Sequence, residues 1–135
     1  MAAVPLTDVR ARAAEALAPA SDSDPDVFPD YVDAVQPPAL LLEWNDPWVE
    51  LRTVAGGAGF YNALLNVLCV VGRVDPGPAL GDLEGLVSFV VGRFQADPIS
   101  WALVASQAPR EFSISDVPLL AARLTFRVAV AVEGG

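Results

Sequence analysis

Two long segments in which apolar residues alternate constrain this fold more than any other feature of the sequence. Over Phe60–Arg73, every second residue from Tyr61 to Val71 is apolar. The segment Leu119–Val132 shows the same alternation. Polar residues fall between the apolar positions of these segments, at Asn62, Asn66, Arg123, Thr125 and Arg127. A period of two is typical of a strand with one buried face, so both segments predict long strands with a polar second face.

Shorter patterns predict the remaining elements. Apolar residues at helical spacing predict helices over Thr7–Leu17, with Thr7 as the N-cap, and over Ala79–Gln95, from Leu80 to Phe94. Strands are expected at Ala39–Trp44, Trp48–Val54 and Ile99–Ser106. The connections are a turn at Asn45-Asp46-Pro47, a flexible hairpin tip at Gly56–Gly59, a turn at Asp75–Pro78 and an irregular stretch at Pro109–Pro118.

This order of elements predicts one α+β domain over residues 1–135. The expected sheet is antiparallel or mixed, has four to five strands, and carries both helices on one face. An acidic, proline-rich loop at about 19–38 interrupts the domain. Connections of that length are uncommon inside compact domains, so we expect this loop either to be disordered alone or to pack on something.

The composition argues against catalysis. The chain has no histidine, and all eight basic residues are arginine, so the usual general base, the Ser-His and Cys-His pairs and Schiff-base chemistry are missing. The net charge of −9 disfavours binding to nucleic acid phosphates. The single cysteine, Cys69, lies in an apolar run and is expected to be a core residue in a reducing compartment. We therefore expect a protein that is not an enzyme.

Two patterns resemble ligand sites but lack required residues. Five aspartates in the acidic loop have the spacing of a calcium loop, yet Val27 occupies the position that requires glycine. The glycines at 56, 57 and 59 lack the Gly-Lys-Ser/Thr ending of a phosphate loop. We therefore expect no metal and no cofactor.

The N-terminus has no basic region followed by an apolar run, and the longest apolar runs are too short to span a bilayer. Hydrophobic residues nevertheless make up 53% of the chain, which is high for a soluble monomer. Either the core is generous, or part of the apolar surface is reserved for partners.

The order of elements resembles that of the tail terminator proteins of long, non-contractile-tailed bacteriophages, over nearly the whole chain. Three parts carry the resemblance. The first is the short helix, followed by an irregular stretch and the apolar segment Pro37–Leu42. The second is the strand Phe60–Arg73, which leads through Asp75-Pro76-Gly77 into the helix Ala79–Phe94. The third is the ending, which consists of Ala108–Phe112 and Val117–Val128. The acidity of Ser21–Pro38, and Ser115-Asp116-Val117 in place of the usual glycine before the final strand, depart from the family.

The resemblance implies a virion protein of the tail neck, assembled in the host cytoplasm. Such a protein closes the tail tube as a homohexameric ring, stops tube polymerisation and presents a docking surface to the head-tail connector protein. DNA passes through the ring without specific binding, and no membrane is involved. Two alternatives stay open: another neck component, such as a head-side connector or tail-completion protein, and a small ferredoxin-like binding module of a cell.

The sequence also suggests where subunits would meet. Long, valine-rich strands near a sheet edge invite a partner unless something covers them. We therefore expect the inter-subunit contacts to use the polar face of the sheet and the hairpin tip. The candidate interface residues are Asn62, Asn66, Arg123, Arg127, Gly56, Gly57 and Gly59.

Overall fold

The computed structural model describes residues 4–21, 24–29, 37–55, 58–72, 76–114 and 116–131. Its strands are β1 (Val4–Pro5), β2 (Asp26–Phe28), β3 (Ala39–Ala55), β4 (Ala58–Gly72), β5 (Ala102–Ser106), β6 (Arg110–Ile114) and β7 (Val117–Ala131). Its helices are the 3-10 turn η1 (Leu6–Asp8), α1 (Val9–Leu17) and α2 (Pro76–Ala96).

Within the described residues, seven strands form one mixed sheet in the order β1-β7-β4-β3-β2. The central strands β3, β4 and β7 are antiparallel neighbours, whereas β1 pairs with β7 and β2 with β3 in parallel. Along the edge of β7 away from β4, the strands β6, β5 and β1 follow one another. The expected α+β class and mixed sheet are confirmed. The sheet has more strands than expected because β1, β2 and β6 are too short to show alternation.

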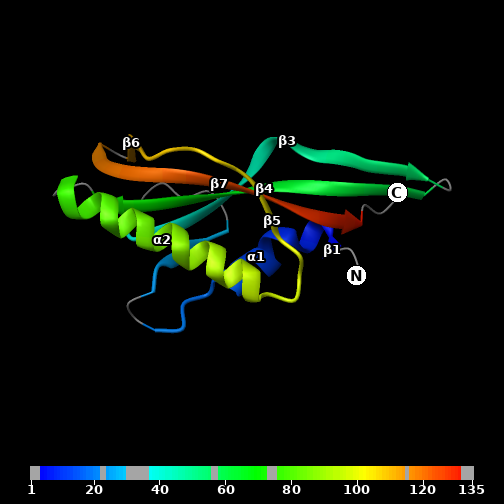
Figure 1. Ribbon diagram of the computed structural model, residues 1–135, viewed down its shortest axis with the longest axis horizontal. Helices are drawn as coiled ribbons and strands as arrows, with labels where there is room; N and C mark the ends of the chain where they lie inside the picture. The colour runs from blue at the N-terminus through cyan, green and yellow to red at the C-terminus, as the bar shows by residue number, and fades with distance from the viewer. Residues whose placement is uncertain are drawn as a thin grey trace.

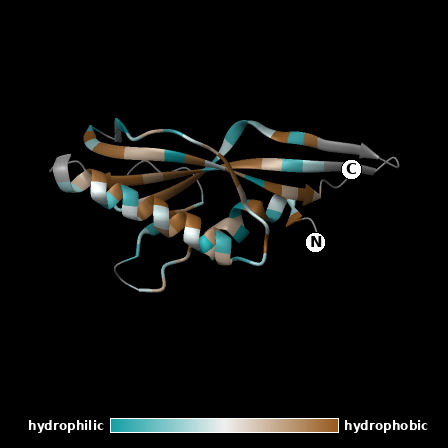
Figure 2. Ribbon diagram, viewed as in Figure 1, coloured by the Kyte–Doolittle hydropathy of each residue, from teal (hydrophilic) through white to brown (hydrophobic). Residues whose placement is uncertain are grey.

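Both helices cover the same face of the sheet (Figure 1). Residues of α1 and α2 pack there on alternate residues of β4 and β7. Figure 2 shows the hydrophobic residues of the long strands as brown segments of the ribbon. Five residues at the apolar alternate positions of the two long strands are all buried in this cluster: Leu65, Val67, Leu124, Phe126 and Val128. The prediction that each long strand buries the face formed by its apolar alternate positions is therefore confirmed. Cys69 lies in the same core, as expected.

The helices differ from the prediction at their N-termini. The turn η1 precedes α1, which begins at Val9, and the residue before it, Asp8, makes no side-chain cap. Thr7 is therefore not the N-cap. The helix α2 begins at Pro76, three residues before the predicted start, because proline is tolerated in a first turn, where amides lack helical partners. Leu80 was predicted to lie in the core stripe but is 45% exposed.

Strand β3 is continuous where the sequence predicts a turn between two strands. Asn45-Asp46-Pro47 does not reverse the chain. Instead, the register slips between Trp44, opposite Leu65, and Val49, opposite Ala63. Four residues of β3 thus face one residue of β4, and the amide of Asn45 donates to the carbonyl of Pro47 within this bulge at 3.0 Å. Asn45, Asp46 and Pro47 therefore lie in a β-bulge of one continuous strand and do not form a turn between two strands.

The β3–β4 hairpin is confirmed, but its tip is shorter than predicted. Ala55 pairs with Ala58, and Gly59 pairs with Val54 inside the ladder. Gly56 and Gly57 lie outside the described residues. The hairpin also extends beyond β7, whose pairing with β4 begins at Tyr61 (Figure 1).

Two further boundaries are corrected. Strand β5 begins at Ala102 instead of Ile99, because the Asp97 carboxylate holds the preceding turn: it accepts hydrogen bonds from the Ile99 amide and the Trp101 indole, at 3.2 and 2.9 Å. The stretch Pro109–Pro118 contains β6, which pairs antiparallel with β7. The turn between them includes Asp116, whose φ of 66° is a left-handed conformation that favours glycine and is tolerated by aspartate.

Candidate assembly surface

The polar residues predicted to form an interface lie on the sheet face opposite the helices, as their alternation requires. Asn66 and Thr125 are direct partners in the β4–β7 ladder, and the Thr125 hydroxyl donates a 2.7 Å hydrogen bond to Asn66 Oδ1. Asn62 and Asn66 are only 7% and 4% exposed. Because both asparagines are buried within one chain, they offer little surface to a neighbour.

The two predicted arginines connect strands that are not neighbours. Arg123 Nε on β7 lies 3.2 Å from Glu43 Oε1 on β3, and Arg127 Nε lies 3.7 Å from Glu50 Oε1. Strand β4 runs between them, so each pair bridges three strands. All four side chains keep between 38 and 46% of their surface exposed. Exposed pairs of this kind contribute about 0–1 kcal/mol each to stability. Because the pairs are weak and their side chains are partly exposed, a partner can still contact the arginines. Their contact with another subunit stays a prediction.

The same face also carries an apolar cluster that the sequence analysis missed. Val70, Leu119 and Ala121 are buried there, with Leu41 and Leu68 packed against them. This face was predicted to be polar, and that prediction holds only for its middle. The signal was present in the sequence, because the alternate positions of β4 that include Asn62 and Asn66 also include Leu64, Leu68 and Val70.

One edge of the sheet is open along most of β3. The described partner β2 pairs only with Ala39–Leu41, so no described strand covers the outer edge of β3 from Leu42 onward. Two large apolar side chains are exposed along this stretch: Trp48, at 45%, and Leu51, at 53%. Trp48 packs on Trp44 with ring centroids 4.9 Å apart.

The opposite edge is open along β5. All five of its residues are exposed, and β7 is its only partner among the described strands. Leu103 and Val104 are 47% and 39% exposed. No charged residue occurs between Asp97 and Arg110. Edge strands of monomers are usually protected by charge, proline or a covering element, and within the described residues β5 has none of these.

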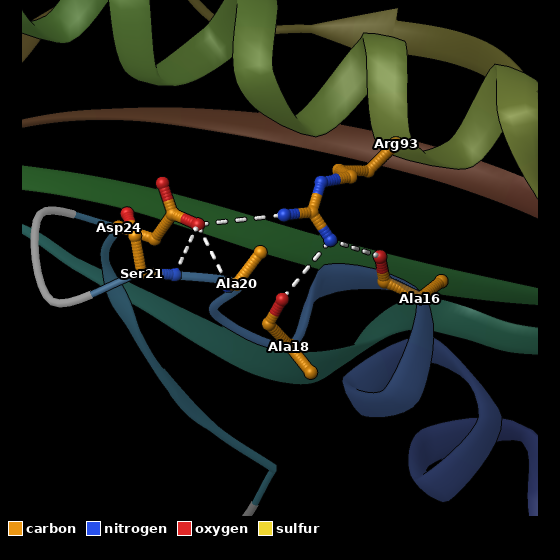
Figure 3. Close-up of polar contacts among 6 residues, drawn as sticks. All are labelled: Ala16, Ala18, Ala20, Ser21, Asp24 and Arg93. Atoms are coloured by element: carbon orange, nitrogen blue, oxygen red, sulfur yellow. Dashed lines mark hydrogen bonds and ion pairs between the residues drawn. The ribbon is translucent and has the colours of Figure 1, made fainter.

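An arginine on α2 fixes the start of the acidic segment against the helices (Figure 3). Arg93 Nη1 donates to the carbonyls of Ala16 and Ala18 at the end of α1, and its Nη2 contacts Asp24 Oδ2 at 3.4 Å. The same carboxylate oxygen accepts hydrogen bonds from the amides of Ala20 and Ser21. The acidic loop is therefore anchored to α2 at Asp24, whereas residues 22–23 and 30–36 lie outside the described part.

Beside this anchor lies a cavity of about 660 Å³ between α2, the end of β4 and the prolines that precede β3. Its lining is mostly proline, glycine and apolar residues, with Asp24 and Asp82 as the charged members among the described residues. Two carboxylates with no adjacent nucleophile–base pair supply no evident catalytic chemistry.

No group of three or more potential metal ligands occurs among the described residues. None of the helices in that part of the chain is long and apolar enough to cross a membrane. No protein-family model and no curated protein sequence matches the chain. The surface itself therefore has to indicate the function, and its distinctive features are the two open edges of the sheet.

Proposed function

We propose that this protein is a structural joint of a bacteriophage tail. It caps the tail tube as a ring, which we expect to be a homohexamer, ends tube polymerisation and joins the tail to the head-tail connector protein. The order of elements in the sequence supports this family, and the exposed apolar edges of the sheet support a role in protein assembly.

The observation that carries the proposal is that no described strand covers most of either edge of the sheet, and that both edges carry exposed apolar side chains. On one edge these are Trp48 and Leu51, and on the other Leu103 and Val104. Edges of this kind are templates for pairing with another chain. Two different open edges favour head-to-tail association, which generates a closed ring when the rotation between subunits closes.

The charge of the chain fits passage of DNA without binding. A net charge of −9 per subunit makes a ring strongly acidic, and such a ring repels the phosphate backbone. Repulsion of this kind would let the genome slide through the ring without being held. Partner recognition then depends on the shape and chemistry of the two ring faces, one for the tube and one for the connector.

Native mass measurement, on the protein alone and with tail tube protein, tests the proposal. We expect a ring, and we expect electron microscopy to show one ring at one end of each tube, with tubes of limited length. Rings found at the head side of a neck would instead indicate a connector or tail-completion protein. A stable monomer that neither binds tubes nor limits their length would contradict the proposal and favour a small binding module.

A further inference from the structure

The strand directions of the sheet define what happens when two copies meet edge to edge. Strands β3, β4 and β7 alternate in direction, and β5 is antiparallel to β7. Therefore β5 runs opposite to β3 within one chain. If a second copy is placed with the same orientation beside the first, its β3 lies next to β5 of the first copy and runs antiparallel to it. Antiparallel pairing is the slightly more stable of the two arrangements.

The exposed leucines lie on the same face of the sheet. Leu103 is directly opposite Phe126 in the β5–β7 ladder, and Phe126 belongs to the core under the helices. Leu51 is opposite Tyr61, which packs against the same core. A sheet that continues from one copy to the next keeps its faces, so Leu103 of one copy and Leu51 of the next lie on the helix-covered side. Opposite apolar side chains in a ladder stabilise the pair.

From these directions and faces we infer that β5 of one copy pairs antiparallel with the Val49–Ala55 half of β3 in the next copy, with Leu103 against Leu51. This inference rests on the proposed ring and names its subunit contact. The sheet then continues around the ring with every helix on one side.

Pairing of β5 with a second β5 is the main competitor, because it also joins two antiparallel edges. It leaves the β3 edge of both copies open, with Trp48 and Leu51 exposed. A single head-to-tail contact covers both edges at once, and it explains why both carry apolar residues. Beyond the bulge around Pro47, the open β3 edge runs from Val49 to Ala55 with one further register shift, between Leu51 and Thr53. Strand β5 has a shift of its own, between Leu103 and Ala105.

Cysteine cross-linking of the full chain distinguishes the two pairings. Cys69 is buried and burial raises its pKa to about 12, so introduced thiols are the reactive ones at neutral pH. Leu51→Cys and Leu103→Cys are prepared singly and together and are oxidised after assembly. We expect each single variant to stay uncross-linked, their mixture to give covalent dimers, and the double variant to give a ladder ending at the ring size. Covalent dimers from Leu103→Cys or Leu51→Cys alone, or assembled rings without any cross-link, would overturn the inference.

A charge substitution supplies the second measurement. Leu103→Lys should reduce ring formation at least tenfold, because it desolvates a lysine in the pairing, whereas Leu80→Lys should leave it unchanged. Leu80 is the matched control, since it is 45% exposed but lies on α2, a helix that packs on β4 and β7. Circular dichroism checks that both variants fold. If both variants form rings equally well, or if the wild-type protein is monomeric, the pairing is wrong. Cross-linked rings that fail to cap tubes would refute only the proposed function, and tubes capped without the cross-link would refute only this pairing.

Discussion

Strands β4 and β5 lie in one sheet, and both are rich in apolar residues, yet they differ in what covers them. On the helix-covered face of β4, residues such as Leu65 and Val67 are fully buried. Every residue of β5 is exposed, and Leu103 keeps 47% of its surface. Burial of apolar surface stabilises the fold at about 25 cal/mol per Å². The buried side chains of β4 therefore stabilise the fold, whereas the exposed side chains of β5 contribute little burial energy. The hydrophobic residues thus lie both in the core and on an exposed edge, where we propose that they serve assembly.

The largest test of this contrast compares two leucines. Leu124→Ala removes a side chain that is 2% exposed, and we expect it to lower the free energy of unfolding by about 2–5 kcal/mol. Leu103→Ala, on the exposed strand, should change the free energy of unfolding of the dissociated protein by less than about 0.5 kcal/mol. Chemical denaturation of both variants at low concentration measures this difference. Equal losses would mean that β5 belongs to the core.

Cys69 tests the same core through pH. Burial raises its pKa to about 12, above the value of 9.0 for an exposed thiol, so the folded state favours the protonated form. Protonated Cys69 contributes its full stabilisation below pH 9. This contribution to the free energy of unfolding falls as pH rises toward 12, by up to about 1.4 kcal/mol per pH unit. We expect Cys69→Ala to remove this contribution to the pH dependence of the free energy of unfolding. An identical pH dependence in both proteins would contradict the buried position.

Arg93 tests how firmly the acidic segment is attached to the helices. Arg93→Ala removes the hydrogen bonds to the end of α1 and the contact with Asp24, and we expect a loss of about 1–2 kcal/mol in the free energy of unfolding. Arg12→Ala is the control, because its pair with Glu15 is exposed and should contribute less than about 0.5 kcal/mol. If the two substitutions have the same effect, the Arg93 contacts do not hold the segment in solution.

Arg127 should have a small effect on stability and a clear effect on assembly. Arg127→Glu places two carboxylates together at Glu50, which should lower the free energy of unfolding by about 1 kcal/mol or less because both side chains are exposed. If Arg127 also contacts the neighbouring subunit, ring formation weakens while the monomer stays folded. Analytical ultracentrifugation measures the assembly. Unchanged rings would place Arg127 in solvent.

The sequence predicts the centre of the fold better than its edges. The alternation along β4 and β7 indicates both long strands and the side they bury, because a core on one face imposes a period of two. It cannot indicate β1 and β2, whose two and three residues have no period, nor that Asn45-Asp46-Pro47 forms a bulge. Whether such residues turn the chain depends on the neighbouring strand, which local sequence does not specify.

The candidate interface shows the same limit. The polar residues on β4 and β7 were placed on the correct face, but Asn66 bonds Thr125 within the chain, and only the register reveals that contact. The exposure of β5 could not be predicted from its residues, because Ala102–Ser106 has the composition of a buried strand. Only the sheet order shows that this segment lies at an edge that no other described strand covers.

Amide hydrogen exchange in the free and the assembled protein compares the two regions directly. On assembly, we expect the amides of β5 and of Val49–Ala55 to exchange at least tenfold more slowly, because their outward groups gain partners in the next subunit. The amides of β4 from Tyr61 to Val70 should be protected in both states, since β3 and β7 already flank that part of the strand. If β5 exchanges equally fast in the free and assembled protein, the open edges of the sheet are not where the subunits join.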